Sequence, residues 1–312
     1  MTVTQMEYLI AVDTYRNFAE AAKHCYVTQP TLSMQIKKVE EELNILVFDR
    51  SKKPVLTTDV GRQIIAQARI AVNETNRIYE IINNQKDDIT GELKIGIIPT
   101  LSPYLLPLFI SDFMHKYPKV DLIIDEMVSE QIIQKLNNDT IDAAILVTPI
   151  NEPSIVEIPL FYERFFLYIS EMHPLMKRNK IEYSDIDTSD IWLLKEGNCF
   201  RNQVINMCGD HFTHKRHQLK FEGGSLETIK RIVDSQYGFT IIPELATIEL
   251  TDIQKQKIKA FPSPEPVREV SLVVRRSFMK RKLLNLLQEE ILAHIPKSIM
   301  ENDNSQLISW RS

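Results

Sequence analysis

Two cysteines, Cys199 and Cys208, stand nine residues apart in the stretch K-E-G-N-C-F-R-N-Q-V-I-N-M-C. They are two of the three cysteines in 312 residues. If the interval is helical, nine steps of about 100° place the two residues on opposite faces and about 13.5 Å apart along the axis. A disulfide needs Cα atoms within about 7 Å. Bond formation would therefore require the segment to be rebuilt, so the spacing predicts a thiol pair whose oxidation is a conformational signal.

A reactive Cys199 has to be a thiolate, and a free thiol has a pKa of about 8.5. The guanidinium of Arg201, two residues on, and a helix N-terminus at Asn198 would both stabilise a negative sulfur. We expect Arg268 to approach the sulfur from a later strand. These neighbours favour a thiolate at neutral pH.

Peroxide would oxidise such a thiolate to a sulfenic acid, which Cys208 would condense to a disulfide. Thr100 and Ser129 lie just after two predicted strands, near 93–98 and 121–127. The carboxyl ends of strands in α/β folds are where ligands bind. We therefore expect the two hydroxyls to donate hydrogen bonds to the peroxide oxygens.

Composition places this chemistry in the cytoplasm. The chain is 44% apolar and 25% charged, which is ordinary for globular proteins, and its length implies two or three structural units. Met1 to Ala11 does not resemble a signal peptide, and no apolar run of about 18 residues would form a membrane span. In a reducing compartment a disulfide is expected to be transient and regulatory.

Residues 1–58 are predicted to form a winged helix-turn-helix. Three helices are expected between residues 4 and 45, with Asn17 and Thr28 as N-caps of the second and third. The stretch 47–57 reads as a two-stranded wing with Arg50, Lys52 and Lys53 near a phosphate backbone. This unit has seven basic and seven acidic residues, so on these residues alone an ordinary helical domain is an equal alternative.

Residues 59–87 are predicted to be one linker helix with a heptad seam. The seam consists of apolar or small residues at alternating steps of four and three, namely Ile64, Ala68, Ala71, Thr75, Ile78 and Ile82. We expect it to join two chains, because paired DNA half-sites require a dimer. The alternative is a helix that packs on its own domain.

From residue 88 to 300 strands alternate with helices, which predicts an α/β regulatory domain of two lobes. Lobe I is expected at about 88–160 and 268–300, and lobe II at about 161–267. Strands are expected in eight segments, near 93–98, 121–127, 141–147, 156–170, 191–194, 218–222, 239–242 and 269–274. Residues 301–312 are mostly polar, with Trp310 as their one aromatic residue, and are expected to be a disordered tail.

The stretch A-A-K-H-C-Y-V-T-Q-P-T-L-S-M-Q-I-K-K-V-E-E-E-L-N-I-L-V-F-D-R, residues 21–50, resembles the signature of LysR-type transcriptional regulators. The resemblance implies a two-lobed fold like that of periplasmic binding proteins and a double-stranded DNA partner. It implies DNA contacts by seven residues, namely Gln29, Pro30, Thr31 and Ser33, with Lys37, Arg50 and Lys53 in support. The chain departs from the family at Asn44, where glycine is usual, and at Met34.

The stretch K-E-G-N-C-F-R-N-Q, with Cys208 nine residues after its cysteine, is similar to the peroxide-sensing OxyR branch of that family, as is I-G-I-I-P-T-L-S-P-Y-L-L-P at 95–107. The resemblance implies that Cys199 is the peroxidatic thiol, Cys208 the resolving thiol and Arg268 part of the pocket. It further implies a homotetramer that repacks on oxidation and contact with RNA polymerase. Asn198 and Ser129 replace a histidine and a threonine.

Three rival hypotheses remain open. Cys208, His211, His214 and His217 lie at three-residue intervals and would suit a metal, although Lys215 and Arg216 would repel it. An ordinary member of the family would instead bind a small organic effector in the cleft. A thiol peroxidase would share the chemistry but leave residues 1–84 without a role, so we expect no enzyme and no cofactor.

Overall fold

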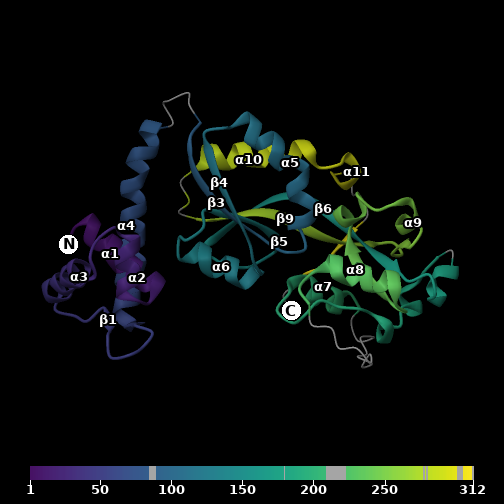
Figure 1. Cartoon of the computed structure of the whole chain (residues 1–312), viewed down its shortest axis with the longest axis horizontal. Coiled ribbons are helices and arrows are strands. Elements are labelled where there is room, and N and C mark those ends of the chain that lie inside the picture. The colour runs from purple at the N-terminus through teal and green to yellow at the C-terminus, as the bar shows by residue number, and fades with distance from the viewer. Residues whose placement is uncertain are drawn as a thin grey trace. The chain divides into compact units, whose positions relative to one another are not determined.

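The computed structural model describes residues 1–83, 89–178, 180–208, 223–276, 278, 280–300 and 305–310. The chain divides into two units, Met1–Asp88 and Ile89–Ser312. Figure 1 labels most of the helices and several of the strands of both units. Among the described residues, no helix is long and apolar enough to cross a membrane.

The first unit is a helix-turn-helix followed by a small wing. Its helices are α1 (Val3–Tyr15), α2 (Phe18–His24), α3 (Gln29–Leu43) and α4 (Asp59–Asn83). Thr2, Asn17 and Thr28 start the first three helices, and each side-chain oxygen accepts a hydrogen bond from a backbone N–H of the first turn. The wing is the antiparallel pair β1 (Phe48–Asp49) and β2 (Leu56–Thr57). The three helices, the wing and the two caps predicted from the sequence are therefore present.

The first half of α4 packs within its own unit. Ile65, Ala68 and Val72 are buried, and Ile65 belongs to the core that α1, α2 and α3 share. Ala68, one of the seam residues, is thus covered by packing within the chain. Ile78, a seam residue in the second half of the helix, is 60% exposed. Dimerisation through the later part of the seam stays a prediction.

The second unit is built on one curled, mixed sheet. Its strands are β3 (Gly91–Ile97), β4 (Val120–Glu126), β5 (Ala143–Thr148), β6 (Ile155–Ile169), β7 (Phe239–Pro243), β8 (Ile258–Ala260), β9 (Glu265–Arg275) and β10 (Ser305–Leu307). The strand order is β4-β3-β5-β9-β6-β7, with β10 beside β9 and β8 beside β6. β3 runs parallel to β4 and β5, whereas β9 is antiparallel to β5 and β6.

Helices cover this sheet. They are α5 (Ser102–Lys116), α6 (Ser129–Asn137), α7 (Cys199–Cys208), α8 (Leu226–Ser235), α9 (Asp252–Lys255), α10 (Arg281–His294) and α11 (Lys297–Met300). Short 3-10 turns occupy Pro174–Lys177, Tyr183–Asp185, Thr188–Asp190 and Glu244–Thr247. Together with the sheet they give the α/β class expected from the alternating pattern.

Two hydrophobic cores define two lobes. Lobe I is the core formed with β3, β4, β5, α5, α6 and α10, and lobe II is the core formed with β7, α7 and α8. The 15-residue β6 begins in the first core and ends in the second, and its pairing with β9 spans Ile155 to Arg164. The two lobes are therefore joined by strands of the sheet itself (Figure 1).

Two expectations about this unit are wrong. Residues 191–194 form no strand; Ile191 makes one isolated bridge to Phe239 before the chain turns toward α7. The tail is not disordered at 305–310, because β10 pairs with β9 and the indole of Trp310 is buried. The strand expected at 218–222 lies outside the described residues.

Candidate functional site

Cys199 is the first residue of α7, in a turn that requires glycine. Gly197 adopts a φ of +83°, a left-handed conformation that costs other residues energy. The Asn198 side-chain oxygen accepts a hydrogen bond from the Phe200 N–H at 3.0 Å, so it caps the helix. The helix runs to Cys208, so the condition on which the sequence argument depended is met. Its nine steps hold the two Cα atoms about 13.5 Å apart along the axis, beyond the reach of a disulfide.

The start of α7 packs into both lobes. The buried Cys199 side chain belongs to the hydrophobic core of lobe I, whereas that of its neighbour Phe200 belongs to the core of lobe II. Movement of the first turn of α7 would therefore disturb both cores at once.

Arg268 is the centre of a buried polar network beside this turn. It is fully buried on β9, directly opposite Glu163 of β6, and its Nε donates to Glu163 Oε1 at 2.7 Å. Its two Nη atoms donate to the Thr100 hydroxyl at 3.1 Å and to the Thr100 carbonyl at 3.2 Å. The guanidinium also lies 5.4 Å from the centre of the Phe200 ring. Leu245 N–H completes the network by donating to Glu163 Oε2 at 3.0 Å.

Ser129 is the polar group that faces the sulfur. It is the first residue of α6 and is buried. Its hydroxyl interacts with Cys199 and lowers the pKa of that thiol, yet no described atom meets the oxygen with full hydrogen-bond geometry. A buried hydroxyl without a complete partner is costly to maintain and is suited to binding a small polar molecule.

Burial raises the pKa of Cys199 and is the largest influence on it. The Ser129 hydroxyl, the charge of Arg268 and the Phe200 N–H oppose this rise, while the charge of Glu130 adds to it. The net direction is upward. Desolvation by burial therefore opposes the thiolate that the sequence predicted, and the resting thiolate stays a prediction.

Arg201 is not brought to the sulfur. Its guanidinium donates to the Leu194 carbonyl at 3.5 Å and lies 4.0 Å from a Glu196 carboxylate oxygen. Residues two apart on a helix do not face each other, so sequence proximity to Cys199 misled the prediction. Of the predicted pocket residues, Ser129 and Arg268 act on the thiol, and Thr100 is connected to it through its hydrogen bonds from Arg268.

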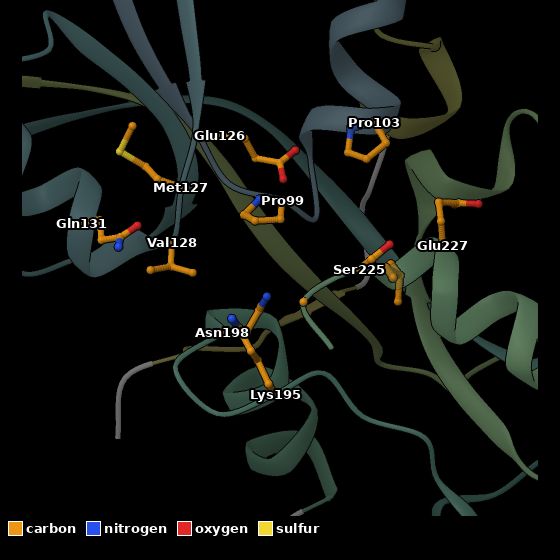
Figure 2. Close-up of a pocket in the computed structure, with 12 residues that line it drawn as sticks. Pro99, Pro103, Glu126, Met127, Val128, Gln131, Lys195, Asn198, Ser225 and Glu227 are labelled. Carbon is orange, nitrogen blue, oxygen red and sulfur yellow. The ribbon is translucent and has the colours of Figure 1, made fainter. Parts of the chain in front are cut away.

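A cleft of about 480 Å³ opens beside Asn198 (Figure 2). Its lining comes from both lobes: Pro99, Pro103, Glu126, Met127, Val128 and Gln131 from lobe I, and Lys195, Asn198, Gly224, Ser225, Leu226 and Glu227 from the other side. Sequence reasoning missed the charged members, although Glu126 lies near the end of a predicted strand and Lys195 begins the cysteine stretch. Tyr104 of α5 donates to Glu227 at 2.6 Å and so links the two lobes at the cleft.

In the first unit, the residues predicted to meet DNA lie on the first turns of α3, at Lys37 in its middle and on the wing. Gln29, Pro30, Lys37 and Lys53 are exposed, and Thr31 is half-buried. Exposed polar side chains on the N-terminal turns of a recognition helix are placed to reach base edges and phosphates.

Arg50 and Ser33 contact each other and tie the wing to α3. Arg50 donates to the Ser33 hydroxyl at 3.2 Å and to Glu40 at 2.8 Å. The buried Glu40 also accepts from the Val47 and Phe48 N–H groups. Arg50 therefore has a structural role that the sequence did not reveal. α3 ends at Asn44 with a φ of 53°, a conformation asparagine tolerates in place of glycine.

The metal hypothesis stays untested, because three of its four residues, His211, His214 and His217, lie outside the described part of the chain. Asp112, Glu290 and His294 do cluster, with ligand atoms within 4.8 Å of one another. The ammonium of Lys116 already pairs with Glu290 at 2.7 Å, and this positive charge opposes a cation there.

Comparison with known proteins identifies both units. Residues 3–62 match the bacterial regulatory helix-turn-helix protein, lysR family, and residues 86–295 match the LysR substrate binding domain. A hydrogen peroxide-inducible genes activator of Haemophilus influenzae is 35% identical over 88% of this chain and 91% of its own. The DNA-binding transcriptional dual regulator OxyR of Escherichia coli K12 is 33% identical over 95% and 96%. A full-length OxyR variant of Pseudomonas aeruginosa superposes with a TM-score of 0.78 at 31% identity, covering 96% and 100% of the two chains.

Proposed function

The chain belongs to the LysR family of transcription regulators and is not an enzyme; from this premise we propose that it is a hydrogen-peroxide-responsive DNA-binding regulator of the cytoplasm. The observation that carries the proposal is the buried Cys199 at the start of a helix that ends at Cys208. The surrounding hydroxyls and the Arg268 charge supply the polar contacts that a peroxide needs in a buried pocket.

The first step oxidises Cys199. Its proton leaves as the thiolate forms, the sulfur attacks one peroxide oxygen, an S–O bond forms and the O–O bond breaks. The sulfur loses two electrons to the peroxide, whose other oxygen leaves as water. The Thr100 hydroxyl accepts from Arg268, so its own hydrogen is available for a peroxide oxygen, and Ser129 supplies a second hydroxyl. Arg268 would stabilise the transient thiolate.

The second step condenses the sulfenic acid with Cys208. An S–S bond forms, the S–O bond breaks and the oxygen leaves as water. The helical separation of about 13.5 Å forbids this bond, so α7 has to unwind and withdraw Cys199 from the core of lobe I. A cellular dithiol would return the pair to the reduced state. The output is thus a rearrangement of the regulatory unit.

The first unit would convert this rearrangement into altered DNA binding. Gln29, Pro30, Thr31 and Ser33 would approach the bases of double-stranded DNA while Lys37, Arg50 and Lys53 contact phosphates. A dimer through the later part of α4, around the exposed Ile78, would pair two readers, and a tetramer would pair two dimers. Rotation of subunits on oxidation would change the half-site spacing and the contact with RNA polymerase.

The test is peroxide oxidation followed by disulfide mapping. One equivalent of peroxide should give a Cys199–Cys208 bond in the purified full chain and leave Cys25 reduced, as judged by mass spectrometry. Cys208→Ser should stop at the sulfenic acid, Cys199→Ser should not react, and Cys25→Ser should behave as the parent. DNase footprints of the reduced and oxidised parent should differ. An unmodified Cys199 would remove the redox mechanism while leaving DNA binding intact.

The cleft supports a second candidate, a small organic effector. Its volume of about 480 Å³ and its mixture of Lys195 with Glu126 and Glu227 suit a small polar molecule. An effector of this kind would shift the melting temperature and the footprint of Cys199→Ser as much as those of the parent. Loss of both shifts in Cys199→Ser would leave the thiol as the sensor.

A further inference from the structure

Residues Ser305–Trp310, here named the strap, bridge both lobes of the regulatory unit. β10 pairs in parallel with the start of β9, and the Ile308 N–H donates to the Val267 carbonyl at 2.9 Å. The Ile308 side chain lies in the core of lobe II and that of Trp310 in the core of lobe I. The Trp310 indole N–H donates to the Val147 carbonyl at 3.0 Å. The strap is therefore anchored in the hydrophobic cores of both lobes.

Between these anchors the strap is hydrogen-bonded to α7. Gln203 Nε2 donates to the Ile308 carbonyl at 2.9 Å in a fully buried contact, and Asn206 Nδ2 donates to the Ser309 carbonyl at 2.9 Å. The two donors are three residues apart, so they lie on one face of the helix. Both lie between Cys199 and Cys208. The strap thus contacts the part of the chain that disulfide formation has to rebuild.

We propose that the strap holds α7 helical in the reduced protein and that its release limits the disulfide step, with Gln203 and Asn206 as positioning residues. The inference rests on the proposed function and deepens it. Unwinding α7 with the strap in place would leave the buried Ile308 carbonyl without its donor, a loss that costs more than an ordinary exposed hydrogen bond. Helix unwinding and strap release are therefore coupled.

The strap acts on one chemical step only. Its hydrogen bonds with α7 are made at Gln203 and Asn206, about one and two helical turns beyond Cys199. Oxidation of Cys199 by peroxide should therefore proceed unchanged in strap variants. The condensation with Cys208, in which S–S forms and water leaves, should become faster when the strap is weakened.

Asn206→Ala and its matched control Asn202→Ala test the strap. Asn202 is exposed on the same helix, four residues earlier, so both substitutions change helix propensity equally, and only the first removes the bond to the Ser309 carbonyl. After a pulse of one equivalent of hydrogen peroxide, quench and mass spectrometry follow sulfenic acid and disulfide separately. We expect Asn206→Ala to close the disulfide about fivefold faster than Asn202→Ala, the effect of roughly 1 kcal/mol for one hydrogen bond.

Trp310 variants extend the test. Trp310→Ala should close the disulfide at least about tenfold faster than the parent, because it loses an indole anchor as well as a hydrogen bond. Trp310→Phe keeps an aromatic ring, and its rate of disulfide formation should lie between those of the parent and Trp310→Ala. Hydrogen exchange of the parent should show the Ile308 amide protected when reduced and at least about tenfold less protected when oxidised.

The outcomes separate the strap from the sensor. Equal disulfide rates in Asn206→Ala and Asn202→Ala, or equal protection of Ile308 in both states, overturn the strap while the redox mechanism stands. The strap is also overturned if Asn206→Ala accelerates formation of the sulfenic acid as much as formation of the disulfide, because the strap would then act on the pocket. No disulfide in the parent removes the strap and the redox mechanism together.

Discussion

Replacement of Arg268 by methionine should strip the buried Glu163 of its charge partner. Glu163 would keep the Leu245 N–H and lose the guanidinium, and the Thr100 carbonyl would lose its donor. Removing one member of a buried ion pair costs about 3–5 kcal/mol, because an uncompensated charge remains in the interior. At a urea m-value of about 1–3 kcal/mol/M, the unfolding midpoint should fall by roughly 1–5 M.

Tryptophan fluorescence measures this loss selectively. The chain has two tryptophans, Trp192 and Trp310, and both are buried in the Ile89–Ser312 unit. Urea titration of the full chain followed by tryptophan emission therefore reports the regulatory unit alone. Glu163→Gln in the Arg268→Met background removes the stranded charge and keeps an acceptor for Leu245 N–H. The free energy of unfolding of the double variant should exceed that of Arg268→Met by at least about 1 kcal/mol.

The dependence on pH supplies a second reading of the same pair. Burial raises the pKa of Glu163 and Arg268 opposes the rise, so Arg268→Met should raise it further. A carboxyl whose pKa is higher in the folded state favours folding below its unfolded pKa of about 4.3, and this advantage is lost as pH rises through the folded value. The free energy of unfolding of Arg268→Met should therefore fall from pH 4 to pH 8 relative to that of the double variant. The coupling is refuted if the effects of Arg268→Met and Glu163→Gln on the free energy of unfolding add within about 0.5 kcal/mol and the pH profiles of Arg268→Met and the double variant are parallel.

Other contacts give three further expectations. Ser129→Ala should raise the pKa of Cys199, slow peroxide consumption at pH 7 and move the stopped-flow rate profile to higher pH; an unmoved profile would exclude the hydroxyl. The Glu290 carbonyl and Asp112 raise the pKa of His294, so its charge stabilises the fold below the ordinary value of about 6.5 and this gain is lost as pH rises through the raised value. His294→Asn should remove the fall of the urea midpoint as pH rises from 6 to 9, and a midpoint that still falls would contradict this. Tyr26 is 96% exposed with a φ of 54°, a strained conformation that asparagine tolerates. Tyr26→Asn should therefore have an equal or higher melting temperature by circular dichroism, with up to about 1 kcal/mol gained in the free energy of unfolding. A lower melting temperature would show that the tyrosine ring stabilises the unit.

Local signals in the sequence were reliable where the structure is local. The caps Asn17 and Thr28 act within one helical turn, and residue spacing alone gives the separation of Cys199 and Cys208 once the segment between them is helical. The same locality misled the prediction for Arg201, whose short distance from Cys199 in sequence is undone by the rotation of the helix.

Long-range features were harder to predict because they depend on residues brought together by the whole fold. The rise in the Cys199 pKa comes from burial in lobe I, which residue types around the cysteine do not reveal. The tail is ordered because it pairs with β9, about forty residues earlier in the sequence. A three-residue strand is too short to show the alternation of apolar and polar residues from which a strand is predicted. Trp310 was the available signal, since a lone aromatic in a polar tail needs a place to be buried.

The separation of the two cysteines along α7 can also be expressed as an effective concentration. A ten-residue helix is marginal on its own, so a free peptide of residues 199–208 would be a flexible chain whose ends meet within about 10–100 ns. Each thiol would then experience the other at roughly millimolar concentration. In the folded protein the helix reduces this value almost to zero. The fold therefore withholds a reaction that the bare segment would undergo readily, and the sensor works by controlling when that proximity is restored.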